Sequence, residues 1–126
     1  MNALGTQILL ELKDCDRHLL DDVGYVREML KQVAREVGVH VVGESFHKFH
    51  PQGVTGILAI AESHISIHTW PEHSYAAVDV FTCGEAEQAY KAAELLIAGF
   101  GAHEHTRTVL ERGPLSQPAR LAGAQR

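Results

Sequence analysis

The clearest periodic pattern in the chain is a helical one near the N-terminus. Apolar residues recur there at alternating steps of four and three, which is the spacing of one face of a helix. They are Leu19, Val23, Val26, Leu30, Val33 and Val37. Asp16 can cap the start of such a helix, and Gly38 stands where helices commonly end. We therefore predict one helix over 17–37.

Six other segments are short, apolar and rich in β-branched residues, which is typical of strands. Pro51 and Pro71 mark turns between some of them. A second helix is predicted from Gly84, with an alanine-rich apolar face that ends at Phe100. This order of elements predicts an α+β fold, in which an antiparallel sheet carries two helices on one face. The predicted strands are 5–13, 39–48, 54–61, 64–70, 75–82 and 103–111.

The predicted strand at 54–61 is apolar on both of its faces. Val54, Leu58 and Ile60 take one parity, and Ile57 takes the other together with two alanines. A sheet that is covered on one side only has a cleaner alternation of apolar and polar residues. Because only two helices are available, we expect a second copy of the chain to cover the other face. The two sheets would then stack into an αββα sandwich.

Composition limits the number of domains, the partners and the cellular compartment that we expect for this fold. The chain has 126 residues, enough for one domain, which we place at 1–113. A loose tail is expected over 114–126. The formal net charge of −5 argues against nucleic acid as a partner. Two cysteines far apart in the sequence indicate free thiols in a reducing cytoplasm. No segment resembles a signal peptide or is apolar for long enough to span a membrane.

Reactive side chains are concentrated between Glu62 and Glu72, and their residue types allow three interpretations. Histidine pairs at short spacings suit a metal ion, although no structural zinc motif accompanies them. These pairs are His47/His50, His64/His68 and His103/His105. A serine hydrolase would need a Gly-x-Ser-x-Gly motif around Ser63, which is missing. The third interpretation is a set of ordinary polar residues on a strand.

Strand parity adds an independent constraint on this segment. His68 and Trp70 share one parity, and the two isoleucines of the same strand take the other. Cys83 follows the outward parity of the next strand, so two adjacent strands can present His68, Trp70 and Cys83 on one face. Ser63 has the parity of the isoleucines. A turn or bulge near Glu62 and Ser63 must therefore re-aim its side chain.

Three long motifs give the chain a specific resemblance to a known family. They are FHKFHPQGVTG at 46–56, ESHISIHTWPE at 62–72 and YAAVDVFTCG at 75–84. Together they resemble the bacterial and archaeal S-adenosylmethionine decarboxylase proenzymes of the short, thermotogal type. The resemblance extends from about Gly5 through Gly113.

This resemblance implies that the chain cleaves itself into a β chain, 1–62, and an α chain, 63–126. The Ser63 hydroxyl would attack the Glu62 carbonyl, and β-elimination would leave a pyruvoyl group at the start of 63–126. His68 corresponds to the processing histidine of the family. Thr55 stands where the family usually has a serine that assists processing, and threonine keeps the hydroxyl.

The resemblance also implies the roles of the remaining site residues. The pyruvoyl group would form a Schiff base with the substrate, and Cys83 would return a proton after carbon dioxide leaves. Phe49 and Trp70 would hold the adenine, and Glu72 would bind the ribose. The product, decarboxylated S-adenosylmethionine, would serve spermidine synthesis. From the residues alone, Cys83 also suits a small buried position and Phe49 a place in the core.

Two other functions remain open at this point. A relative that acts on arginine or ornithine would keep Ser63, His68 and Cys83 but would not need an adenine slot. A non-catalytic module with a histidine-rich metal site would keep none of this chemistry. We expect no metal cofactor, and we expect the active enzyme to be a homodimer of cleaved protomers.

Overall fold

A computed structural model describes residues 3–114 of the chain. Within these residues the chain forms six strands and three α-helices, and a short 3₁₀-helix lies between the fourth and fifth strands. In chain order the elements are β1 (Ala3–Lys13), α1 (Arg17–Leu20), α2 (Val23–Val37), β2 (Val41–Lys48), β3 (Val54–Ile60), β4 (Ser63–Trp70), η1 (Pro71–His73), β5 (Tyr75–Thr82), α3 (Ala86–Gly99) and β6 (Glu104–Pro114).

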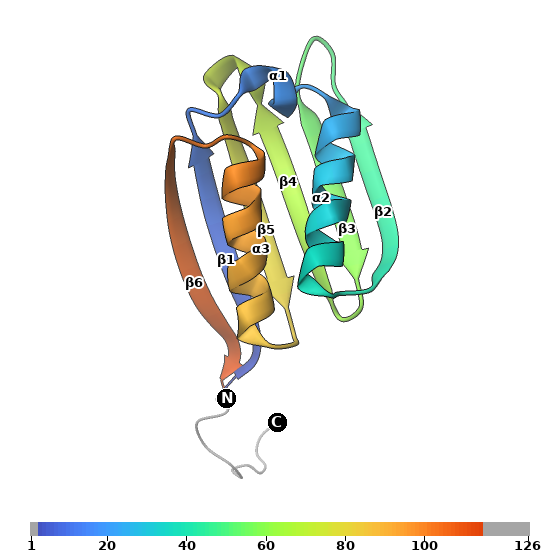
Figure 1. Ribbon diagram of the computed structural model, residues 1–126, viewed down its shortest axis with the longest axis vertical. Coiled ribbons are helices and arrows are strands. Elements are labelled where there is room, and N and C mark those ends of the chain that lie inside the picture. The colour runs from blue at the N-terminus through green and yellow to red at the C-terminus, as the bar shows by residue number, and fades with distance from the viewer. Residues whose placement is uncertain (1–2, 115–126) are drawn as a thin grey trace.

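The strands form one antiparallel sheet in the order β2-β3-β4-β5-β1-β6. β1 is the first strand in the chain, yet it pairs with β5 on one side and β6 on the other. The two long helices, α2 and α3, lie on the same face of the sheet (Figure 1). The predicted α+β fold, with helices on one face, is therefore confirmed. No helix within residues 3–114 covers the opposite face, which we call the open face.

The single helix predicted between Asp16 and Gly38 is wrong in one respect, because the chain forms two helices with a break at Asp21 and Asp22. The Asp22 carboxylate caps α2. The Asp21 carboxylate accepts a hydrogen bond of 2.8 Å from the backbone N–H of Gly53, which lowers the pKa of Asp21. Aspartate side chains compete in this way with helical hydrogen bonding. The predicted ends, Asp16 and Gly38, are confirmed.

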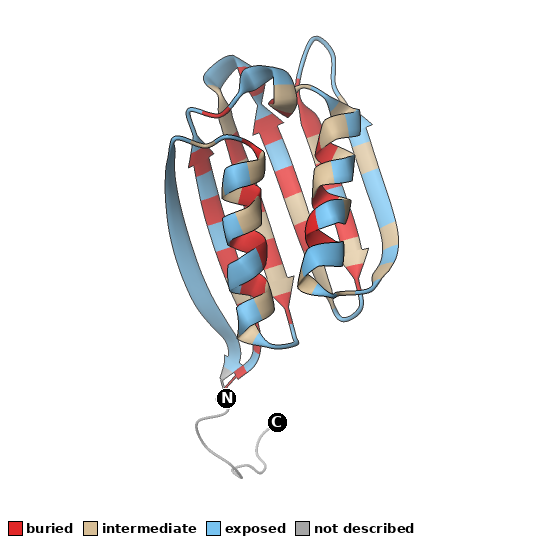
Figure 2. Cartoon of the chain, viewed as in Figure 1, coloured by how far each residue is buried: buried red, intermediate tan, exposed pale blue. Residues whose placement is uncertain are grey.

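The core lies between the helices and the sheet, and β4 presents it clearly (Figure 2). Ile65 and Ile67 are fully buried against the helices, whereas His68 and Trp70 on the same strand are exposed. This alternation agrees with the parity expected from the sequence. On β3, Leu58 is fully buried in the same way.

The open face keeps several large apolar side chains in contact with solvent. Ile57 on β3 is 45% exposed, and Leu9 on β1 is 38% exposed. Leu110 on β6 is also exposed, and it pairs with Gln7 of β1, whose neighbours Thr6 and Ile8 are buried. The two-sided apolar pattern of β3 therefore corresponds to a face that has no cover within the described part of the chain.

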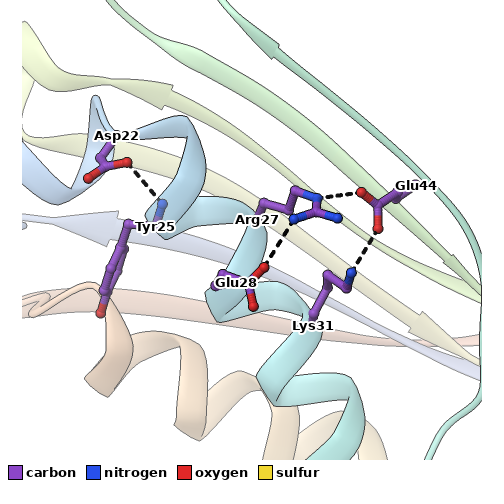
Figure 3. A network of polar contacts seen from close by, with 6 residues as sticks. All are labelled: Asp22, Tyr25, Arg27, Glu28, Lys31 and Glu44. Carbon is purple, nitrogen blue, oxygen red and sulfur yellow. Dashed lines mark hydrogen bonds and ion pairs between the residues drawn. The ribbon is translucent and has the colours of Figure 1, made fainter.

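A group of ion pairs fastens α2 to the outer strand β2 (Figure 3). Glu44 on β2 accepts a hydrogen bond from Arg27 Nε and lies 3.2 Å from Lys31 Nζ, and both cations belong to α2. Arg27 also lies 3.0 Å from Glu28 within the helix. These charges face solvent, where ion pairs contribute little to stability. They link α2 to β2 at this edge of the sheet.

The C-terminal strand is longer than predicted. β6 continues to Pro114, where the sequence led us to expect an end at residue 111. Its last residue pairs with Ala3 at the start of β1. The tail predicted over 114–126 otherwise lies outside the described residues.

Candidate active site

Thr55 and His68 occupy directly paired positions on the neighbouring strands β3 and β4. Thr55 Oγ1 lies 3.2 Å from His68 Nδ1, within hydrogen-bond distance. Both side chains follow the parity that points away from the helices, because their neighbours Val54 and Ile67 are buried. The structure therefore joins the predicted processing histidine to the hydroxyl that was predicted to assist it.

A cavity of about 300 Å³ opens beside this pair. The turn after β2 and the helix η1 carry its other walls, because Phe49 follows β2 directly and Glu72 lies within η1. Phe49 is 46% exposed and Trp70 is 41% exposed, so the core position considered for Phe49 is wrong. All three predicted substrate-binding residues line this cavity. Its lining consists of Phe49, Gln52, Gly53, Thr55, His68, Thr69, Trp70 and Glu72.

Trp70 rests on Tyr75, with ring centroids 5.4 Å apart and planes inclined by 30°. The Tyr75 hydroxyl donates a hydrogen bond to Glu11 on β1. This hydrogen bond to a carboxylate, together with burial, raises the pKa of Tyr75 to about 12. The Tyr75 hydroxyl is therefore held as a donor to Glu11, and its ring backs the indole that lines the cavity. Sequence reasoning missed Tyr75 and Glu11.

Ser63 lies at the opposite end of β4, next to a tight turn. Glu62 has a φ of +62°, in the left-handed region that non-glycine residues rarely adopt. The register from β3 to β4 is regular and pairs Ser63 with the buried Ile60. The turn predicted near Glu62 is therefore present, but Ser63 keeps the parity of the isoleucines and no bulge re-aims it. Ser63 Oγ accepts a hydrogen bond of 3.1 Å from the backbone N–H of Cys83, just past the end of β5. Cys83 is exposed, so its placement as a buried residue is wrong.

These two groups of residues do not meet within one chain. Ser63 and His68 are five residues apart on one extended strand, which places them about 16 Å apart at roughly 3.3 Å per residue. Cys83 lies at the Ser63 end, whereas Trp70 lies at the His68 end. The expected common face for His68, Trp70 and Cys83 therefore does not gather these three residues at one point. Within residues 3–114 the predicted site residues thus form two separate groups, which we call half-sites.

A further polar contact lies between these half-sites and was not predicted. His64 Nε2 lies 2.8 Å from Asp79 Oδ2, on the neighbouring strand β5. Strand parity placed both residues outward, but the pairing register that brings them together cannot be read from the sequence.

A metal site of three ligands is not found among residues 3–114, where no group of three or more His, Cys, Asp or Glu side chains is arranged to hold an ion. The histidine pairs of the sequence therefore do not converge within this part of the chain.

None of the helices within residues 3–114 has both the length and the apolar character needed to cross a membrane.

Comparisons with known proteins agree on one family. A family model described as S-adenosylmethionine decarboxylase matches residues 6–113. A protein of Acetivibrio thermocellus named S-adenosylmethionine decarboxylase proenzyme is 45% identical over 97% of this chain and 98% of its own length. A protein of the same name from Caldanaerobacter subterraneus is 44% identical over the same shares.

A solved structure gives the same answer for the fold. The crystal structure of the adenosylmethionine decarboxylase from Aquifex aeolicus is similar, with a TM-score of 0.89 and 35% identity. The similarity covers 94% of this chain and 98% of that one. With the motifs around Ser63 and the near-complete match in length, the chain belongs to the S-adenosylmethionine decarboxylase family.

Proposed function

We propose that this chain cleaves itself between Glu62 and Ser63 and then decarboxylates S-adenosylmethionine. The observation that carries the proposal is the placement of Ser63. Its hydroxyl oxygen is held by the Cys83 backbone N–H, directly after a glutamate in the left-handed region. Relatives that match nearly the whole chain are named as decarboxylase proenzymes.

Cleavage begins with attack by Ser63 Oγ on the carbonyl carbon of Glu62. The peptide nitrogen leaves, and the amide becomes an ester. Elimination then removes the proton from the Ser63 α-carbon and expels the Glu62 carboxylate. Water then displaces the nitrogen of residue 63, which departs as ammonia. A ketone remains at that position. The left-handed backbone of Glu62 costs roughly 1–2 kcal/mol, and this strain at the reacting peptide favours the attack.

The cleavage needs a base, and His68 of the same chain lies about 16 Å from Ser63 at the rise of an extended strand, too far to reach it. A second copy of the chain resolves this. If two open faces stack about a two-fold axis that crosses the strands, the Ser63 end of each copy meets the His68 end of the other. The exposed apolar side chains of the open face, Ile57 and Leu9 among them, would be buried by the same contact.

The residues around Ser63 fit the pyruvoyl group that cleavage would leave there. When formed, this group supplies a carbonyl that accepts the substrate's α-amino group and draws the electrons released with carbon dioxide. Cys83 has an exposed thiol, and the backbone N–H of the same residue donates a hydrogen bond to Ser63 Oγ. In this proposal that thiol delivers a proton to the α-carbon of the substrate.

The cavity suits the nucleoside part of S-adenosylmethionine. Phe49 and Trp70 offer exposed aromatic surfaces on which an adenine can stack. The Glu72 carboxylate can accept hydrogen bonds from two ribose hydroxyls. Aromatic faces also attract the positive sulfonium group. Arginine or ornithine would leave these aromatic surfaces unused, so the cavity favours the larger substrate.

The test compares wild type with Ser63→Ala, and Ser66→Ala, another serine on β4, is the control. We expect two fragments from wild type and from Ser66→Ala by intact mass, and one chain of 13.8 kDa from Ser63→Ala. Carbon dioxide release is then measured with S-adenosylmethionine, arginine and ornithine. Fragments from Ser63→Ala would refute the cleavage mechanism, and a wild type that prefers a free amino acid would refute the substrate.

A further inference from the structure

A continuous row of hydrogen bonds crosses four neighbouring strands and ends beside Ser63. Arg112 Nη1 on β6 donates to Gln7 Oε1 on β1 at 2.6 Å. Gln7 Nε2 donates to Asp79 Oδ1 on β5 at 2.9 Å. Asp79 Oδ2 lies 2.8 Å from His64 Nε2 on β4. We call these four residues the polar row.

Each bond in the polar row has a fixed direction. An ionised carboxylate only accepts hydrogen bonds, so Asp79 requires a proton on His64 Nε2 and a donor from Gln7. Gln7 meets this requirement because its amide oxygen is already occupied by Arg112. The far end of the row therefore orients Asp79, and Asp79 in turn orients His64. The His64 ring also lies against Phe81, with centroids 5.7 Å apart.

The position of His64 in the chain gives this arrangement its significance, in a step that rests on the proposed function. Before cleavage, residue 63 is tied to the chain on both sides. After cleavage it becomes a chain end, and chain ends fray unless they are tied down. His64 is then the first side chain behind the new end, and its backbone nitrogen forms the amide next to the reactive ketone.

We infer that Asp79, supported by Gln7 and Arg112, is a positioning residue that clamps the new chain end through His64. The clamp keeps the carbonyl group at position 63 beside Cys83 during turnover. It matters little before cleavage, because the peptide bond to Glu62 then supplies the same restraint. Asp79 is not part of the lining of the cavity beside Thr55 and His68, and its effect passes through His64.

The test uses Asp79→Asn, which keeps the shape of the side chain. Asparagine is neutral and has one acceptor oxygen in place of two, so the hydrogen bond from His64 Nε2 to a charged carboxylate is lost while Gln7 still has an acceptor. The matched control is Glu94→Gln, which removes a carboxylate that pairs with Arg107 on the helical side of the sheet. Both changes are made in wild type and in the uncleaved Ser63→Ala chain. Hydrogen exchange of the backbone amides of 64–66 is measured in these four variants and in their two parents, and turnover is measured in the three proteins that cleave.

In the cleaved protein, Asp79→Asn should speed exchange of the 64–66 amides and lower kcat, each by about tenfold, as expected for the loss of a hydrogen bond to a charged group. KM should change by less than about twofold, because the polar row lies outside the cavity. In the uncleaved chain, exchange should change by less than about threefold, because the intact peptide bond still holds residue 63. Glu94→Gln should behave as its parent in every measurement.

Two results would overturn the clamp alone. One is unchanged exchange of the 64–66 amides in the cleaved Asp79→Asn protein, and the other is an equal increase in the cleaved and uncleaved chains. The second result would mean that Asp79 supports the sheet in general. A wild-type chain that never cleaves would overturn the proposed function and the clamp together.

Discussion

Co-expression of Ser63→Ala chains with His68→Ala chains tests whether the cavity of one copy serves the serine of the other. Each variant alone lacks one partner of the cleavage reaction. In a mixed dimer, however, the His68→Ala chain keeps its Ser63 and faces an intact His68 from the other copy. The stacked arrangement therefore predicts that the mixture restores cleavage.

The size of the effect follows from the half-sites and from dimer statistics. A hydrogen bond spans roughly 3 Å, whereas Ser63 and His68 of one chain are about 16 Å apart along β4. Direct proton transfer between Ser63 and His68 of one copy is therefore not expected. With equal amounts of both chains and random pairing, about half of the His68→Ala chains belong to mixed dimers. About half of all His68→Ala chains should therefore cleave, whereas no Ser63→Ala chain should.

Tags of different mass on the two chains allow intact mass spectrometry to count the fragments of each. Hydroxylamine is left out, because it would also cleave any ester trapped in His68→Ala. Mixed dimers are isolated through both tags in turn, and Ser63→Ala paired with itself serves as the control. If the His68→Ala chains in purified mixed dimers remained uncleaved, the two-copy site would be refuted. Cleavage of His68→Ala alone would refute the role of His68.

Two further predictions concern single side chains. Trp70→Ala should cleave normally but lose about ten- to a hundredfold in kcat/KM for S-adenosylmethionine, because it removes a stacking surface; unchanged efficiency would rule out the adenine slot. Burial, followed by the charge of Asp14, raises the pKa of Cys15 to about 11, so an alkylating reagent at pH 8 should modify Cys83 and spare Cys15 until the chain unfolds. Equal labelling of both thiols in the folded chain would contradict the protection of Cys15. The Cys15 thiol ionises near pH 9.0 in the unfolded chain, so the free energy of unfolding should fall as pH rises from there towards 11.

The layers of the fold could be predicted because periodicity is a local property of the sequence. The four-and-three spacing from Val26 to Val33 marked the buried face of α2, and the alternation around Ile65 and Ile67 marked the buried face of β4. The break at Asp21 and Asp22 was missed. Its cause is a partner 32 positions away in the sequence, the Gly53 backbone N–H, which no local pattern reveals.

The candidate site was predicted residue by residue, but its geometry was not. Parity gives the face of the sheet on which a side chain lies, and it does not tell near which end of the strand that side chain is. Counting the five positions from Ser63 to His68 on one strand would have revealed the two half-sites. The contact between His64 and Asp79 had no such signal, because it depends on how β4 is aligned with β5.

The place of β1 in the sheet decides what happens to the molecule once it is cut. Cleavage after Glu62 would assign β1, β2 and β3 to one fragment and β4, β5 and β6 to the other. Because β1 lies between β5 and β6, and β3 lies beside β4, three of the five strand pairings in the described sheet would join the two fragments (Figure 1). The fragments would then stay together without any covalent link. Once unfolded and diluted, they would have to find each other before β1 could return, so regaining the fold would depend on concentration.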